Sequence, residues 1–483
     1  MPGGNIVGFL ERCFSRRPPR LADLERTGSR HRATRPLVNG DRVIVIGGGI
    51  AGSAFARQLL LLARRENLKI KVYLVNSTNC NYCGGLITDL ALNTMRSFLR
   101  LDLPEDVVLQ KVERCIYVNV SGHVTVELNT PLNAVLRTSR FGVTGFDDSL
   151  KLRILEGLSP EIGNMLEIFE PTVVKRIYRQ EKETGWRVII SRRHESGSFV
   201  ELEGDVLVMA AGFRSLGRPM LQSFIASTGY EPPPIMAASV TEIDTSSAKK
   251  NLVGNNMFIL DNILPGAVLA LIPKSKDWLT LTSLGRHLTK EEVDQVLSHP
   301  GIRQWLELPE ASKHLRCQLV CGAQVFTGPS RRFYGDRWVV IGDLAGYGRV
   351  LKDGYFASFL GSRLAAATMV YHGISERDFA RFYHAPLKNF ILDNRVGMWL
   401  FKVNNFLNRS HWFSHLFMAA GQQEGRSDSY GGFVHSGVRS LVTGELSYRL
   451  TALLFIAGIT YFALTHPGEL QIKLPLDRGG IFG

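Results

Sequence analysis

The apolar positions begin with a strand–helix–strand pattern. A short apolar run at 41–46 ends in glycines, a charge-poor run with helical character covers 50–63, and an alternating, β-branched run covers 69–75. A strand, a glycine turn, a helix and a second strand in this order predict one βαβ unit.

Later apolar runs predict strands of two kinds. The predicted elements are antiparallel strands at 107–136 and 173–202, buried strands at 206–212 and 338–343, and helices at 146–158 and about 354–371. Buried strands followed by helices favour a nucleotide-binding layer, whereas the longer strands favour an antiparallel sheet. The sequence therefore predicts an α/β (α+β) fold, in which a Rossmann-type domain is interleaved with an antiparallel-sheet substrate domain.

The C-terminal part of the chain has a different pattern. Segment 398–418 is rich in aromatic residues and predicts an interfacial amphipathic helix or a packed core helix, and a polar linker is predicted at 421–432. Segment 450–465 carries no charge and would span ~24 Å as a helix, against about 30 Å of bilayer hydrocarbon. A transmembrane helix and a helix lying in the interface are therefore both open. Arg439 and Arg449 precede this segment, which places the main domain on the cytoplasmic side.

Composition narrows the classes of partner. The net charge of +13 suits an anionic membrane surface or nucleic acid, but the chain has no zinc-finger spacing, RNP-type motif or long basic helix. We therefore expect membrane lipid, and not nucleic acid, as a partner. The sequence does not indicate which proteins bind this chain. The Arg-rich first forty residues predict a disordered basic tail, with a transit peptide or a lipid-contacting tail as alternatives.

Six cysteines in a chain of this length do not form a disulfide framework. Four of them form two close pairs, Cys80/Cys83 and Cys317/Cys321. Buried thiols are the first interpretation of such pairs, and a redox pair or a metal site are the alternatives. We predict no bound metal.

The turn of the βαβ unit reads Gly47-x-Gly49-Ile50-Ala51-Gly52. Gly47 allows the tight turn, Gly49 lets the backbone approach a pyrophosphate, and Gly52 lets the helix pack against the sheet. The helix N-terminus, which includes Ala51, offers free N–H groups to that pyrophosphate. The second strand ends at Asn76 where an acid usually accepts the ribose hydroxyls, so we expect altered adenosine contacts but retained binding.

A second motif favours FAD over NAD. The run Gly342-Asp343 follows a buried strand and precedes a helix that begins at Gly354. This run resembles the Gly-Asp motif of FAD-dependent monooxygenases. The resemblance implies that Asp343 accepts a ribityl hydroxyl and that the helix N-terminus points at the flavin, where its dipole stabilises negative charge.

Further motifs resemble the geranylgeranyl reductase family of that superfamily, from about Arg42 to Tyr371. The matches are Cys83-Gly84-Gly85, Arg140 with Phe146-Asp147-x-x-Leu150, and two segments at 265–274 and 281–285. The resemblance implies cofactor contacts by Gly84, Gly85 and Arg140, and a substrate-facing strand that carries Val268, Ala270 and Ile272. It places Cys83 near the flavin.

The chain departs from the family pattern at several positions. Val268, Ala270 and Ile272 replace aromatic residues and predict an apolar substrate wall of another shape. The Ala-Asp-Gly motif of hydroxylases appears as Ala210-Ala211-Gly212, in which Gly212 remains as a cofactor contact and the acid is missing. This difference disfavours a typical NADPH-using hydroxylase.

The leading hypothesis is a membrane-associated FAD-dependent oxidoreductase that reduces or dehydrogenates a C=C bond of an isoprenoid or other lipid. Cys83 is the candidate catalytic proton donor, and NADPH and ferredoxin are candidate electron donors. The alternatives are a flavin-dependent lipid monooxygenase or epoxidase, and a non-enzymatic flavoprotein subunit of a membrane complex.

The predicted domains are a basic tail (1–40), a discontinuous FAD-binding domain (41–222 and 331–372, with inserted strands at about 107–136 and 173–202), a substrate-binding sheet domain (223–330), a helical and linker region (373–446), a membrane-anchoring helix (447–467) and a tail (468–483).

Overall fold

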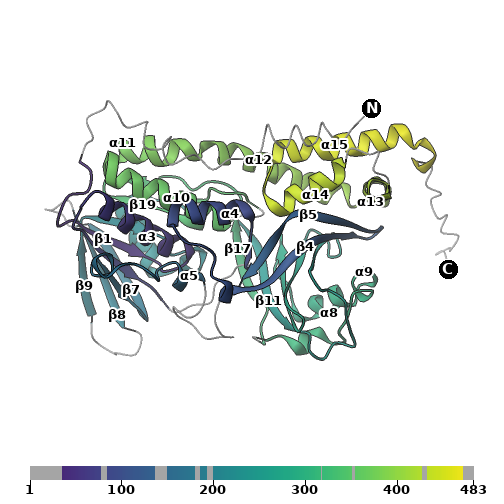
Figure 1. Cartoon of the computed structure of the whole chain (residues 1–483), viewed down its shortest axis with the longest axis horizontal. Coiled ribbons are helices and arrows are strands. Elements are labelled where there is room, and N and C mark those ends of the chain that lie inside the picture. The colour runs from purple at the N-terminus through teal and green to yellow at the C-terminus, as the bar shows by residue number, and fades with distance from the viewer. Residues whose placement is uncertain are drawn as a thin grey trace, which may run out of the picture.

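The computed structural model describes residues 35–77, 84–135, 150–179, 185–192, 199–316, 318–350, 354–426 and 432–470 (Figure 1). Several residues singled out in the sequence lie outside these ranges, namely Cys80, Cys83, Arg140, Phe146, Asp147 and Cys317.

A six-stranded sheet confirms the predicted Rossmann-type layer. Its order is β18 (Tyr334–Gly335), β19 (Trp338–Val340), β10 (Val206–Met209), β1 (Arg42–Ile46), β2 (Lys71–Val75) and β6 (Leu166–Phe169). All neighbouring strands are parallel except the edge pair β18 and β19. Helix α3 (Ile50–Arg65) packs along α10 (Gly354–Ala367), and the two are joined by a hydrogen bond from Ser362 Oγ to the Ala51 oxygen of 2.9 Å.

An eight-stranded sheet forms the second layer. Its order is β17 (Cys321–Phe326), β11 (Ile235–Asp244), β15 (Trp278–Leu284), β14 (Val268–Ser275), β13 (Asn256–Asp261), β4 (Val108–Asn119), β5 (Gly122–Val135) and β3 (Leu86–Ile87). The strands predicted at 107–136 are therefore not an insertion within the nucleotide-binding layer. They form the β4–β5 hairpin, and β4 pairs in parallel with β13 of the substrate sheet.

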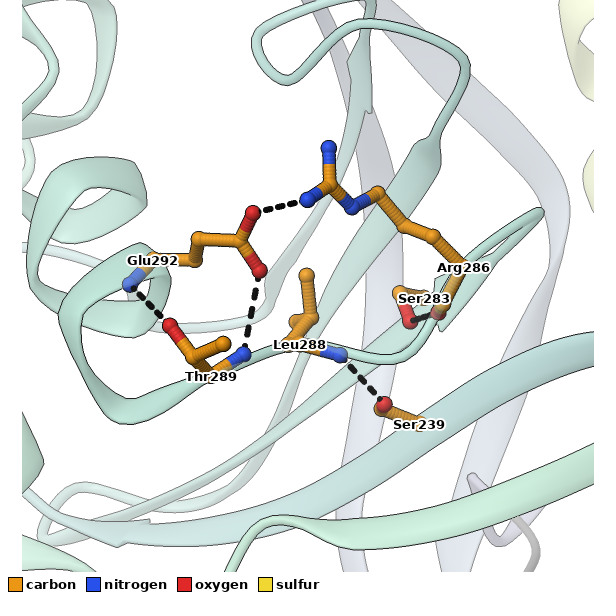
Figure 2. Close-up of polar contacts among 6 residues, drawn as sticks. All are labelled: Ser239, Ser283, Arg286, Leu288, Thr289 and Glu292. Carbon is orange, nitrogen blue, oxygen red and sulfur yellow. Dashed lines mark hydrogen bonds and ion pairs between the residues drawn. The ribbon is translucent and has the colours of Figure 1, made fainter.

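The two faces of this sheet have different partners. Leu269 and Leu271 of β14 point into a core that also contains Val293 and Val296 of helix α8 (Lys290–Ser298). A capping box between Thr289 and Glu292 begins α8, and the Leu288 N–H donates to Ser239 of β11 at 2.8 Å (Figure 2). Because α8 is fixed to this face, the opposite face of β14 is left to line the site.

A three-stranded sheet packs on the same core as the six-stranded sheet. It contains β7 (Thr172–Arg179), β8 (Trp186–Arg192) and β9 (Phe199–Gly204), which confirms the predicted hairpin. Trp186 is fully buried beside Phe224 of helix α7 (Pro219–Thr228), in the same core as the six-stranded sheet.

The helices α12 (Ala385–Leu407), α13 (His411–Arg426), α14 (Phe433–Thr443) and α15 (Tyr448–Thr465) form a C-terminal cap along one long side of the molecule (Figure 1). The aromatic segment 398–418 is split between α12 and α13. The linker predicted to begin at Gly421 is wrong as far as Arg426, because α13 continues there and Glu424 accepts hydrogen bonds from the N–H groups of Val434 and His435.

The apolar segment at the end of the cap is a helix, as the sequence predicts. Among the described helices, α15 has the length and composition needed to cross a membrane, and 39% of it is buried in the protein. Its inner side packs on α14, with Gly458 against Val434.

Two predicted boundaries differ from the structure. The tail predicted at 1–40 ends earlier, because the Leu37 N–H donates to the Met369 oxygen at 2.9 Å and the Leu37 side chain is buried. The helix predicted at 146–158 is described as the short helix α5 (Leu150–Arg153), after which the chain turns.

The remaining elements are α4 (Asp89–Thr94), α6 (Pro160–Gly163), α9 (Pro300–Arg303), α11 (Glu376–Asp378), β12 (Lys250–Asn251), β16 (Leu306–Glu307), π-helical turns at Met95–Leu99, Thr368–His372 and Phe379–His384, and short 3-10 turns.

Candidate functional site

A continuous cavity of about 1190 Å³ joins the two sheets and the C-terminal cap. It runs from the Gly47–Gly52 turn, past the open face of the eight-stranded sheet, to α12, α14 and α15. Pockets for drug-sized ligands occupy about 300–1,000 Å³. The cavity therefore has room for a large cofactor and a further ligand.

The fold requires two of the three glycines of the turn. Gly47 has φ +109°, and a Cβ there would lie 2.4 Å from the Ala210 oxygen. A Cβ on Gly52 would lie 1.8 Å from the Gly47 oxygen, so the first turn of α3 packs directly on the loop. A Cβ on Gly49 would meet nothing within 4 Å. The fold itself does not require glycine at position 49, and the space in front of it is open to a ligand.

Asn76 lies at the end of β2 as predicted, and its side chain binds the turn. Its Oδ1 accepts from the Gly48 N–H at 3.0 Å, and its Nδ2 donates to Glu170 Oε1 at 2.9 Å. An amide oxygen has two lone pairs, so Oδ1 retains one acceptor site for a ribose hydroxyl. Glu170 follows β6, the parallel neighbour of β2, and its carboxylate orients the Asn76 amide from outside the residues that line the cavity.

The Gly342-Asp343 motif lies across the cavity from β2, at the end of β19. Gly342 has φ +69°, and a Cβ there would lie 2.8 Å from the Ala51 Cβ, so the two loops touch. The Asp343 carboxylate keeps accessible surface inside the cavity, but protein surrounds the cavity, and this burial raises the pKa of Asp343. Gly354 begins α10 and lines the same cavity.

Lys274 fixes the loop that carries Gly84 and Gly85. Its ammonium is fully buried and donates to the Gly84 oxygen at 2.7 Å, the Gly85 oxygen at 2.8 Å and the Val135 oxygen at 3.3 Å. A buried ammonium is stable when carbonyl oxygens replace its water. Strand β14 thereby holds the glycine loop against the cavity.

The predicted substrate wall lines the cavity. Val268, Ala270 and Ile272 alternate with Leu269 and Leu271, which face the α8 core. The end of Ile272 would lie 2.9 Å from a Cβ on Gly84, so the wall begins beside the glycine loop. Gly212 also lines the cavity. Their contacts with substrate and cofactor remain predictions.

A polar cluster interrupts the apolar wall beyond Val268. Asp261, which pairs with Val268, accepts hydrogen bonds from Tyr117 Oη and from the side-chain amides of Asn404 and Asn408. Burial raises the pKa of Asp261, although all three donors oppose that shift. Burial, and then the charge of Asp261, raise the pKa of the Tyr117 hydroxyl.

Sequence reasoning assigned no role to Glu170, Tyr117, Asp261, Lys274 or the buried Arg349. Two of them could have been found from the sequence, because Asp261 and Lys274 are charged residues that lie within or at the end of apolar runs typical of strands. Tyr117 and Glu170 could not, since their neighbours come from segments distant in the sequence.

No family model and no curated protein matches this sequence. The structure, in contrast, is similar to many solved structures. A geranylgeranyl bacteriochlorophyll reductase-like protein from Thermoplasma acidophilum shares 11% identity and a TM-score of 0.57, over 90% of this chain and 98% of that chain. A flavoprotein/dehydrogenase from Cytophaga hutchinsonii shares 14% identity and a TM-score of 0.58, over 83% and 92%. A p-nitrophenol 4-monooxygenase from Pseudomonas putida shares 12% identity and a TM-score of 0.52, over 88% and 99%.

These similarities cover nearly the whole length of the compared chains, so they concern the entire architecture. At this level of identity they establish the fold. The chain has the fold of these flavoproteins, and the predicted fold class is confirmed.

Proposed function

We propose that this protein is an FAD-dependent oxidoreductase that acts on the C=C bond of an isoprenoid or other lipid at a membrane surface. The observation that carries the proposal is the cavity itself. One end is a glycine turn with open space at Gly49 and a carboxylate at Asp343, and the other end has mainly apolar walls. Such a cavity fits a dinucleotide beside a hydrophobic substrate.

The residues present fit FAD. The Gly47–Gly52 turn would hold the pyrophosphate at the N-terminus of α3. Asn76, oriented by Glu170, would hold the adenosine ribose, and Asp343 would accept from the ribityl chain. A bound flavin supplies hydride chemistry, while the protein orients it and excludes water. Lys274 would fix the Gly84–Gly85 loop beside the ring.

The outer side of the cap supports membrane association. On α12, the exposed apolar residues Leu392, Trp399 and Phe406 alternate with the exposed basic residues Arg395 and Lys402. Aromatic and basic residues mixed on one exposed helix face suit an anionic lipid interface. We infer that α12 and α15 lie on the headgroup region of an anionic bilayer.

The outer side of α15 extends this apolar surface. Leu453, Ile456 and Leu464 are exposed, and Leu464 retains 77% of its accessible surface. Since 39% of α15 is buried in the protein, a helix that lies in the interface fits better than one that leaves the protein to span the bilayer.

The cavity reaches this surface. Trp399 and Ile456 both line the cavity and are more than half exposed, at 54% and 57%. Trp399 lies on α12 and Ile456 on α15, so the part of the cavity between these helices would give a lipid an apolar entry from the proposed membrane-facing side. A lipid would enter there without crossing water.

A reductase also needs a proton donor. Cys83, the donor suggested by the sequence, lies outside the described residues, and its role stays a prediction. Its neighbours Gly84 and Gly85 lie on the cavity wall, which supports this prediction.

The proposal is tested with the purified full-length protein. We expect a flavin absorption spectrum and, after anaerobic photoreduction, reoxidation on adding a polyprenyl lipid in anionic vesicles, with a product that carries two additional hydrogens. Absence of flavin would refute the cofactor assignment, and flavin without reoxidation would refute the lipid reaction. Rapid oxygen consumption with an oxygenated product would favour the monooxygenase alternative. Adding NADPH or reduced ferredoxin in place of light would identify the electron donor.

A further inference from the structure

A buried arginine lines the cavity where the nucleotide-binding domain meets the cap. Arg349 retains 3% of its accessible surface. Its Nη1 lies 3.5 Å from the Ser440 oxygen, and its guanidinium carbon lies 4.2 Å from the centre of the Tyr448 ring. The guanidinium is therefore held mainly by stacking on an aromatic ring.

The two other nitrogens of this guanidinium are unsatisfied. Nε and Nη2 of Arg349 are buried and have no hydrogen-bond partner in the structure. They are the adjacent pair of the guanidinium that binds both oxygens of a carboxylate or phosphate in a two-pronged arrangement. A buried charge without a partner is costly, so a ligand that supplies two acceptor oxygens would complete the site.

The surroundings fix Arg349 in this position. Asn394 of α12 accepts from the Val350 N–H at 3.1 Å and donates to the Gly348 oxygen, so it clamps the backbone on both sides of Arg349. Gly397 leaves room for the Tyr448 ring, because a Cβ there would lie 2.6 Å from Tyr448 Cδ2.

The contacts of the guanidinium come from the cap and not from the dinucleotide turn. Ser440 belongs to α14 and Tyr448 to α15. On those helices, the cavity is lined by the apolar residues Val438, Leu441 and Ala452, close in sequence to Ser440 and Tyr448. A cation beside apolar walls matches a ligand that joins an anionic group to a hydrocarbon chain.

We propose that Arg349 binds the carboxylate or phosphate of an acidic amphiphile, which is the substrate class of the cavity. Calling this ligand a substrate rests on the proposed function, whereas the binding of the anionic group to Arg349 does not. Nε and Nη2 would each donate to one ligand oxygen, and the hydrocarbon chain would lie along α14 and α15.

The experiment compares ligands that differ in charge. Binding of oleate, oleyl phosphate and neutral oleyl alcohol to the oxidised full-length protein is measured by titration calorimetry below their micelle concentrations. Charge-assisted hydrogen bonds contribute about 1.5–3 kcal/mol, so we expect an anion to bind roughly 10- to 150-fold more tightly than the alcohol. The better of the two anions identifies the headgroup. Equal affinity for all three ligands in the unmodified protein would overturn the proposal without any variant.

Two variants separate ligand binding from cofactor binding. Arg349→Met should reduce the affinity for the anion to that for oleyl alcohol and leave alcohol binding unchanged, whereas Arg349→Lys should retain part of the preference. The FAD content and the flavin reduction potential should not change. A lowered FAD content or a shifted potential with an intact anion preference would assign Arg349 to the cofactor and overturn the proposal. Anion preference without lipid turnover would refute the proposed reaction and leave the anion site standing.

Discussion

At the glycine-turn end of the cavity, one added methyl group on Gly52 would collide with a main-chain oxygen, whereas at the cap end large apolar side chains stand exposed on the outer surface. The first region is built from backbone, because a strand, a loop and a helix touch at distances that only glycine permits. The second is built from side chains on separate helices. The difference predicts that Gly47 and Gly52 tolerate no larger side chain, whereas the exposed positions of the cap tolerate substitution.

The largest effect is expected from a matched pair of glycine substitutions. Gly52→Ala should lower the free energy of unfolding by an amount at or above the upper end of the roughly 1–3 kcal/mol range for overpacking, because its Cβ meets the Gly47 oxygen. Gly49→Ala should leave the stability of the cofactor-free protein nearly unchanged but weaken FAD binding. Denaturant unfolding and FAD titration measure the two effects. Equal stability losses would show that the open space at Gly49 has no functional meaning.

The second-largest effect is expected at Lys274, which connects strand β14 to the Gly84–Gly85 loop. Lys274→Met should lower the free energy of unfolding by about 1–3 kcal/mol, because it leaves buried carbonyl oxygens unsatisfied. It should also change the flavin absorption spectrum by loosening the Gly84–Gly85 loop. The control is Lys276→Met, at an exposed position on the same hairpin. An unchanged flavin spectrum in a folded Lys274→Met protein would show that this loop does not lie beside the cofactor.

A smaller effect on stability, but a clear effect on binding, is expected at the cap surface. The combined variant Phe406→Ser, Leu453→Ser and Leu464→Ser should bind anionic vesicles at least ~10-fold more weakly, since each exposed side chain would lose part of the about 1.5–3 kcal/mol of its burial in lipid. Its unfolding free energy should change little, because these side chains are exposed. Vesicle flotation measures the binding.

The matched control places the same changes outside the cap. Phe199→Ser, Leu252→Ser and Leu319→Ser also remove exposed apolar side chains, at positions outside the C-terminal cap. Vesicle binding should survive in this variant. If both triple variants lose it equally, the cap is not the membrane-binding surface.

The smallest expected effect is a change in pH dependence at the cofactor end. Burial raises the pKa of Asp343 above 3.8, so between that value and the raised one the folded protein retains a proton that the unfolded chain releases. The stability of the cofactor-free protein should therefore fall as pH rises through this window. Asp343→Asn should flatten this part of the profile, stabilise the cofactor-free protein at neutral pH and weaken FAD binding. Asp277→Asn, at an exposed position, should leave the profile unchanged, and a profile of Asp343→Asn identical to that of the unmodified protein would contradict the assignment.

The sequence by itself determined the cofactor end. The strand, the glycine turn, the helix and the Gly342-Asp343 motif are local features, because each depends on backbone conformation over a few residues. The family resemblance predicted Val268, Ala270 and Ile272 as one wall, and their alternation along β14 puts all three on the cavity side of the strand.

Only the tertiary structure decided the remainder. The pairing of β4 with β13, the carboxylate of Glu170 beside Asn76 and the stacking of Arg349 on Tyr448 each join segments distant in the sequence. Nothing in the local pattern specifies such pairs, because their energy depends on which faces become buried together when the layers pack. The sequence thus predicted where a nucleotide would bind, and packing decided which side chains from distant segments come together.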